Sequence, residues 1–124
     1  MRVVHEPAGG DEQRVLATDV EVADSTLAQA KGLMFRESVP EDFALVMDFQ
    51  EGLLFGGPSW QTVHMLFVPE PIDVVWLVDD EIGKTARLSP WTGVGVAKAN
   101  RIIEFPAGGV DGVAVGDVVR TVED

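Results

Sequence analysis

Residues 63–79 read VHMLFVPEPIDVVWLVD, the most hydrophobic and most clearly patterned stretch of the chain. Within it, Ile72–Val78 contains a single polar residue, Asp73, and is rich in the β-branched and aromatic residues that favour a strand buried on both faces. We expect two strands here, paired as a hairpin through Phe67–Glu70. This pairing predicts that His64 and Asp73 lie inside the protein and directly opposite each other, with their β-carbons about 5 Å apart.

The patterns on either side of this stretch predict a single β-rich domain, residues 1–124. Alternating segments bounded by Gly, Pro and charged turns predict further strands at residues 2–5, 14–23, 43–49, 82–88, 101–105 and 117–122. Asp24-Ser25 can cap one helix of about three turns, in which Leu27, Ala30 and Met34 repeat at helical spacing. The elements together indicate a mainly β fold, an antiparallel β-sandwich or partly closed barrel or roll, with one α-helix packed on the sheet.

The charge balance is the most unusual global property of the sequence. Its 21 acidic and 9 basic residues give a formal net charge of -12. A surface this negative repels phosphate backbones and anionic lipids, so we expect neither nucleic acid nor a membrane as a partner. The same charge suits a salt-rich cytoplasm, as in halophilic archaea, because molar salt shortens the screening length to about 3 Å. The alternative is a merely acidic protein of an organism that does not accumulate salt.

Several classes of site and location can be assessed from residue types alone. The chain has no Cys and two His residues, which excludes disulfides, thiolate nucleophiles and metal sites rich in Cys or His. We therefore predict no metal and no cofactor. The N-terminus lacks the apolar core of a signal peptide, and no apolar run approaches the ~20 residues of a membrane-spanning helix. We expect a cytoplasmic protein.

Several short motifs give the chain a family resemblance. They are Gly32-Leu33-Met34-Phe35-Arg36, Val63-His64, Pro71-Ile72-Asp73-Val74-Val75-Trp76-Leu77, Pro90-Trp91, Ile103-Glu104-Phe105-Pro106-Ala107-Gly108 and Gly116-Asp117. In this order and spacing, between about Asp24 and Val119, the sequence resembles the DUF192 family. The resemblance implies a compact β-rich domain of roll or sandwich type, whose biochemical activity is not established. It supplies no catalytic residues.

Candidate chemistry must therefore come from the polar residues of the apolar strands. If His64 and Asp73 face each other, they form the minimal pair for general acid–base catalysis, because a carboxylate orients the imidazole and raises its pKa. The alternative is structural: Asp73 accepts hydrogen bonds from loop N–H groups while His64 donates to a carbonyl. Glu104 is a third polar residue in an apolar strand and could approach His64. Two carboxylates and one imidazole would match the ligands of non-haem iron, whereas an exposed Glu104 paired with Arg36 or Arg101 would have no such role.

Three tryptophans complete the set of candidates. Trp76 belongs to the core, whereas Trp60 and Trp91 lie in turns, where an aromatic ring either closes the end of a barrel or lines a cleft. We predict a non-enzymatic domain that binds a small molecule or a peptide segment through Trp60, His64, Asp73 and Trp91. The alternative is a hydrolase or isomerase that uses His64 with Asp73 or Glu104. The sequence does not identify the ligand or the oligomeric state.

Overall fold

The structure is a computed structural model of the chain, and it describes residues 1–10, 12–49 and 58–123. Within these residues the chain forms ten strands and one helix. They are β1 (Arg2–Glu6), β2 (Arg14–Ala17), β3 (Asp19–Ala23), α1 (Thr26–Lys31), β4 (Phe43–Asp48), β5 (Ser59–His64), β6 (Ile72–Val78), β7 (Glu81–Leu88), β8 (Val94–Ala99), β9 (Arg101–Pro106) and β10 (Val118–Val122). The predicted mainly β class with one α-helix is confirmed.

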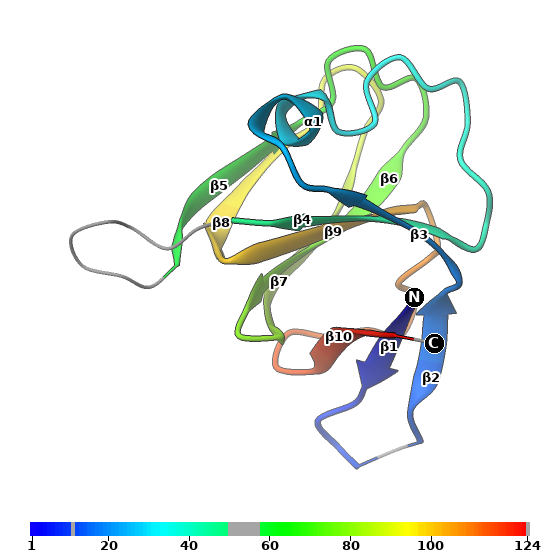
Figure 1. Cartoon of the computed structure of the whole chain (residues 1–124), viewed down its shortest axis with the longest axis vertical. Helices are drawn as coiled ribbons and strands as arrows, with labels where there is room; N and C mark the ends of the chain where they lie inside the picture. The colour runs from blue at the N-terminus through cyan, green and yellow to red at the C-terminus, as the bar shows by residue number, and fades with distance from the viewer. Residues whose placement is uncertain (11, 50–57, 124) are drawn as a thin grey trace.

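The strands form two sheets (Figure 1). Eight of them make one sheet in the order β2-β1-β10-β7-β6-β9-β4-β3, and β5 and β8 make a separate antiparallel pair. In the described residues the edge strands β2 and β3 do not pair with each other, so the large sheet does not close into a barrel. Most neighbours are antiparallel as predicted, but β3 and β4 are parallel because α1 and the following loop carry the chain back between them.

Strand β6 is the centre of the large sheet. It pairs with β7 on one side and β9 on the other, and its residues from Ile72 to Leu77 are buried. Val74 and Trp76 face one hydrophobic cluster, while Val75 and Leu77 face a second cluster on the other side. The prediction that this run is buried on both faces is confirmed.

The ring of Trp76 attaches the small sheet to the large one. Its indole N–H donates to the Gln61 carbonyl of β5 at 3.1 Å. On the neighbouring strand, a β-carbon at Gly95 would lie 2.5 Å from the same ring. Only glycine therefore lets β8 cross the ring at this distance, and β5 is fixed above the sheet through its pairing with β8.

The predicted hairpin between the two strands of residues 63–79 is wrong. Strand β5 pairs with β8, a strand that we did not predict, and His64 lies opposite Val94. Asp73 lies opposite Arg87 of β7 and Phe105 of β9. The reason is that β6 already has neighbours on both edges, so no edge remains for β5.

Two boundaries also differ from the sequence pattern. The strand expected at residues 14–23 is broken at Thr18, because the N–H groups of Thr18 and Asp19 both donate to the Asp42 carbonyl at 3.0 Å. The helix is shorter than predicted, although Ser25 caps it as expected by accepting from the Ala28 N–H. Leu27 is almost fully exposed, so the predicted apolar helix face is wrong at that position. No helix in the described part of the chain is long and apolar enough to cross a bilayer.

Candidate functional site

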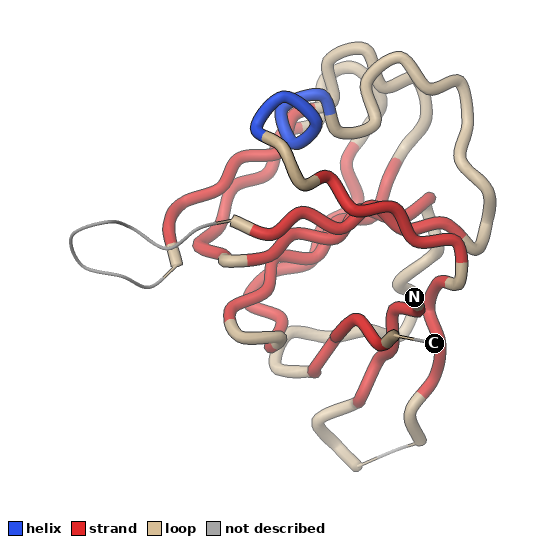
Figure 2. The backbone as a smooth tube through the Cα atoms, in the orientation of Figure 1, coloured by secondary structure: helices blue, strands red, loops and turns tan. Residues whose placement is uncertain are grey.

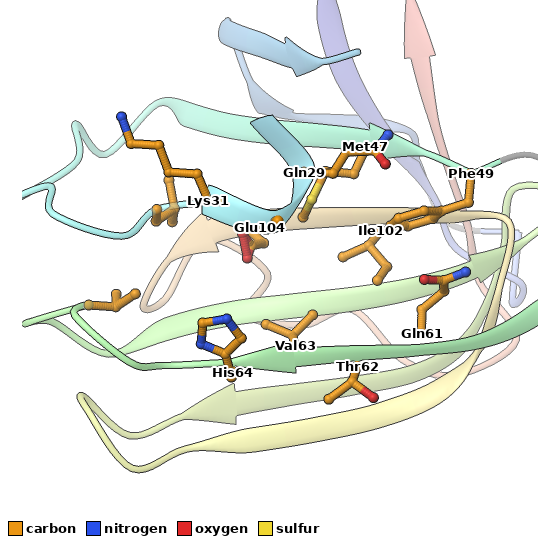
Figure 3. A pocket seen from close by; sticks show the side chains of 14 residues that line it. Gln29, Lys31, Met47, Phe49, Gln61, Thr62, Val63, His64, Ile102 and Glu104 are labelled. Atoms are coloured by element: carbon orange, nitrogen blue, oxygen red, sulfur yellow. The ribbon is translucent and has the colours of Figure 1, made fainter. Parts of the chain in front are cut away.

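Figure 2 shows α1 as the single helix beside the strands. A pocket with a volume of about 360 Å³ is lined by residues of α1, β4, β5 and β9 (Figure 3). Its apolar wall includes Leu33, Met47, Val63 and Ile102. Its polar lining includes Gln29, Lys31, Gln61, Thr62, His64 and Glu104. An apolar cavity with a few polar groups is the usual form of a small-molecule site.

Glu104 is the buried polar group of this pocket. Its register on β9 places it on the same face of the strand as Ile102, which also lines the pocket. The side chain is 3% exposed, and its Oε1 atom has no hydrogen-bond partner among the described residues. Burial raises the pKa of Glu104 from 4.5 to about 7, although the positive charge of Arg36 acts in the opposite direction. The carboxyl group is therefore a mixture of acid and carboxylate near neutral pH.

The end of α1 is shaped to leave room for this carboxyl group. The helix ends at Gly32, which has a φ of 50° and donates its N–H to the Ala28 carbonyl at 3.0 Å. A β-carbon at Gly32 would lie 3.2 Å from Glu104 Oε1. Glycine thus allows both the left-handed backbone and the close approach of the acid.

His64 lies at the rim of the same pocket. It is the last residue of β5 and is exposed, so the prediction that it lies inside the protein is wrong. Its Nδ1 atom accepts from the Leu66 N–H at 3.2 Å, which places the proton of the neutral ring on Nε2. Nε2 has no hydrogen-bond partner among the described residues. Figure 3 shows the imidazole at the edge of the pocket and the Glu104 carboxyl on the wall across from it.

Other polar groups of the lining are less available. The Gln29 side-chain amide donates to the Ala23 carbonyl at 3.1 Å and to the Asp48 carbonyl at 2.7 Å, so it ties α1 to β3 and β4. The Lys31 side chain points away from the cavity (Figure 3). Glu104 and His64 therefore remain as the two groups of the pocket that combine titratable chemistry with an unpartnered polar atom among the described residues.

Asp73 is buried as predicted but does not belong to this pocket. Its carboxylate accepts from Arg87 Nε at 2.8 Å, from Arg87 Nη2 at 3.2 Å and from the Gly108 N–H at 2.8 Å. The predicted His64–Asp73 pair is thus wrong, because Asp73 connects β6 to β7 and to the loop after β9. Among the described residues no three His, Asp or Glu side chains gather as metal ligands, so His64, Asp73 and Glu104 do not form the considered iron site.

The two candidate tryptophans lie outside the lining of the pocket. Trp60 lies on β5, so its predicted place in a turn is wrong, and it is 68% exposed, with Lys98 Nζ 5.6 Å from the centre of its ring. Trp91 follows β7 and makes an edge contact with Phe67. Of the four residues predicted to bind a ligand, only His64 lines the pocket. The structure adds Glu104, a candidate from the sequence only for an enzyme or a metal site, and Gly32. The sequence signal for Gly32 is its position near the end of the predicted helix.

A second buried polar cluster was missed by the sequence analysis. His5 is buried on β1, and its Nε2 lies 2.8 Å from Asp117 Oδ2. Asp117 also accepts the N–H groups of Ala8 and Ala114, and these hydrogen bonds together with His5 lower its pKa from 3.8 to about 2. Arg14 Nε donates to His5 Nδ1 at 3.2 Å. Every member of this cluster is paired, so it is a structural crosslink.

Comparison with solved structures supports the fold. A crystal structure from Sinorhizobium meliloti 1021, described as "a putative transcription regulator", is 23% identical, with a TM-score of 0.77 over 96% of this chain and 91% of that one. A protein of unknown function from Novosphingobium aromaticivorans DSM 12444 is 22% identical, with a TM-score of 0.79 over 98% of this chain and 84% of that one. At these identities the likeness establishes the fold alone.

Comparison of sequences identifies the family. None of the curated proteins matches the chain. Residues 8–121 match the family model described as "DUF192: Uncharacterized ACR, COG1430". They include all residues that line the pocket and all members of the His5–Asp117 cluster except His5. The chain therefore belongs to the DUF192 family, whose members are described as uncharacterised.

Proposed function

We propose that this protein is a non-enzymatic binding domain whose pocket takes a small neutral or cationic molecule, with Glu104 as the anchor. The observation that carries the proposal is the buried Oε1 atom of Glu104, which has no partner in the described part of the chain. An unsatisfied buried carboxyl destabilises a fold, and a ligand that donates a hydrogen bond to it removes that penalty. Hydroxyl, amide and amine groups are such donors.

The charge of the protein narrows the ligand class further. The protein has a net charge of -12 and a carboxyl group inside the pocket. Both its surface and its pocket therefore repel anionic ligands. The same argument disfavours nucleic acid and anionic membranes as partners, because both require a basic surface. One structural neighbour is described as a transcription regulator, but the charge of this chain argues against DNA contact as its mode of action.

The proposal can be tested by screening sugars, nucleosides, amides and amines for compounds that raise the melting temperature. Each compound found would then be titrated into wild type, Glu104→Leu, Glu104→Gln and the control Glu81→Gln, which changes an exposed carboxylate on β7. We expect Glu104→Leu to abolish binding and Glu81→Gln to leave it unchanged. Glu104→Gln keeps an acceptor without a charge, so it retains neutral ligands and loses amines. Equal affinity of wild type and Glu104→Leu would refute the proposal.

A second candidate function, acid–base catalysis by a hydrolase or isomerase, is favoured by the protonation states at the pocket. His64 has a free Nε2 among the described residues, and burial brings the pKa of Glu104 to about 7, where it can act as acid or base. Asp73 takes no part in this version. The test is turnover of any compound that binds. If the protein is an enzyme, His64→Gln still binds the compound but no longer converts it. The rate of the wild-type reaction then also changes with pH near 7.

We also propose that the protein works in a salt-rich cytoplasm of the kind found in halophilic archaea. The support is the excess of 21 acidic over 9 basic residues. Repulsion between the acidic side chains lowers the stability of the folded protein in dilute buffer, and salt screens this repulsion. We expect the melting temperature to rise steeply from low to multi-molar KCl. A melting temperature that is independent of KCl would exclude salt adaptation.

A further inference from the structure

Three exposed aromatic residues from three separate loops meet at one place on the surface. Phe35 follows α1, Phe67 lies between β5 and β6, and Trp91 lies between β7 and β8. The rings of Phe35 and Phe67 stack with centroids 5.0 Å apart, and Phe67 meets Trp91 edge to face at 5.6 Å. Their exposed fractions are 67%, 44% and 51% in the same order. We call these three residues the aromatic platform.

The backbone of the platform is unusual. Phe35, Phe67 and Trp91 have φ values of 67°, 61° and 65°. Among the described residues only two other non-glycine residues have a positive φ, Asp79 and Asp80, and they form the turn between β6 and β7. The left-handed conformation is unfavourable for side chains with a β-carbon and normally selects Gly or Asn. Large exposed rings at three such positions cost conformational free energy, and costs of this kind cluster at functional sites.

Backbone hydrogen bonds hold the three loops together under the rings. The Phe35 N–H donates to the Phe67 carbonyl at 2.8 Å, and the Trp91 N–H donates to the Val68 carbonyl at 3.1 Å. The rings are therefore presented from a connected backbone rather than from independent loop tips. A platform ordered in advance loses little side-chain freedom when it binds.

The charged residues of the same loops are mostly acidic. Glu37 and Glu70 are exposed and have no hydrogen bond or ion pair within the described residues. Arg36, the one cation beside them in sequence, is already paired with Glu21 at 2.5 Å and lies over the Phe43 ring. Unpaired carboxylates thus follow two of the platform residues within two or three positions of the chain. Guanidinium and ammonium groups bind to aromatic rings through cation–π contacts and to carboxylates through ion pairs.

We propose that the aromatic platform is a docking surface for an arginine- or lysine-containing segment of a partner protein. The net charge of -12 steers such a segment toward this protein, and the rings of Phe67 and Trp91 give its cations a specific place to dock. The surface is distinct from the pocket, since none of the three rings lines the cavity around Glu104.

The probe is a short synthetic peptide of alternating Arg and Gly, compared by titration calorimetry with a peptide that has Glu in place of Arg. Trp91→Asn and Phe67→Asn remove a ring but keep a residue that tolerates a positive φ, so both variants should fold. The control is Trp60→Ala, which removes an exposed tryptophan outside the platform. We expect the Arg peptide to bind wild type, Trp60→Ala and Glu104→Leu alike, and to bind each platform variant about tenfold more weakly.

Several results would overturn the proposal. These are equal binding of the Arg and Glu peptides, unchanged binding by folded Trp91→Asn, and an equal loss of binding in Trp60→Ala. Sedimentation with neutral phosphatidylcholine vesicles provides a further check. If wild type sediments, Trp91→Asn does not and the Arg peptide fails to bind, the platform contacts lipid and not a basic protein segment. Because Glu104→Leu tests only the pocket, failure of one proposal leaves the other intact.

Discussion

Glu104 and Asp117 are both buried acidic side chains, yet their surroundings shift their pKa values in opposite directions. Asp117 accepts hydrogen bonds from the N–H groups of Ala8 and Ala114 and from His5, and its pKa falls to about 2. Glu104 Oε1 accepts none within the described residues, and burial raises the pKa of Glu104 to about 7. The comparison separates burial, which disfavours a charge, from hydrogen bonding, which restores it.

The two sites also differ in what they connect. Asp117 joins the N-terminal segment, through the His5 ring and the Ala8 N–H, to its own loop before β10, and these two parts of the chain are distant in sequence. Because the guanidinium of Arg14 donates to His5 Nδ1, the neutral ring carries its proton on Nε2, and this N–H donates a hydrogen bond to Asp117. Glu104 joins no such elements. A buried acid that contributes to folding is fully paired, and one that is left unpaired at a pocket points to a ligand.

The largest expected effect is the loss of the Asp117 crosslink. Asp117→Ala leaves two backbone N–H groups and the His5 N–H without their acceptor, so we expect the free energy of unfolding to fall by on the order of 4 kcal/mol. Urea denaturation at pH 7 measures this. Asp19→Ala, which removes an exposed carboxylate from β3, is the matched control and should change stability by less than about 0.5 kcal/mol. A similar fall in the free energy of unfolding for both variants would show that the Asp117 crosslink contributes no more to stability than an exposed carboxylate.

Glu104→Gln should have the opposite sign. The folded-state pKa of about 7 lies above the value of 4.5, so the native state binds a proton more tightly than the unfolded chain. The contribution of Glu104 to stability is therefore most favourable below pH 4.5 and is lost as the pH rises to about 7. Glutamine imitates the neutral acid, so we expect little difference from wild type at pH 4.5 and a gain of roughly 3 kcal/mol at pH 8. A pH-independent difference in denaturant midpoint would contradict the raised pKa.

The sequence contained enough information for β6 but not for its neighbours. The run from Ile72 to Val78 predicted a strand buried on both faces, because burial on both sides leaves a continuous apolar segment. The partner of β5 could not be predicted, since β8 contains Gly95, Ala97 and Lys98 and has no comparable apolar run. Pairing depends on which edges remain free after the whole sheet has formed, and no local pattern records that.

The candidate site was also only partly predictable, because local sequence patterns do not record how the strands are arranged. Glu104 was recognised as a polar residue among Ile102, Ile103 and Phe105, but a strand that is apolar on both faces does not reveal which face points to a cavity. His64 was predicted to lie inside the protein and is exposed, whereas the buried histidine is His5, for which no burial was predicted. His5 is buried because β1 lies inside the sheet, between β2 and β10, whereas His64 ends a strand of the small sheet and is exposed.

Direct titration would sharpen the comparison without any mutation. In ¹³C NMR spectra of labelled protein, the carboxyl carbons of Glu104 and Asp117 should shift with midpoints near pH 7 and pH 2. The stability that Asp117 provides is fully present above pH 3.8 and is lost as the pH falls toward 2, the reverse of the behaviour of Glu104. Adding a ligand with an amine should lower the Glu104 midpoint and leave that of Asp117 unchanged. Identical midpoints for the two groups would remove the distinction between them.

The smallest effect concerns the glycine beside Glu104. Gly32→Ala places a β-carbon 3.2 Å from Glu104 Oε1 on a backbone with a φ of 50°, so we expect a loss of about 1 to 2 kcal/mol in stability. Gly9→Ala is the control, because a β-carbon there meets no atom within 4 Å. If the space at Gly32 exists for a ligand of Glu104, Gly32→Ala also weakens ligand binding, whereas Gly9→Ala does not. Loss of stability with unchanged affinity would mean that the glycine serves only the end of the helix.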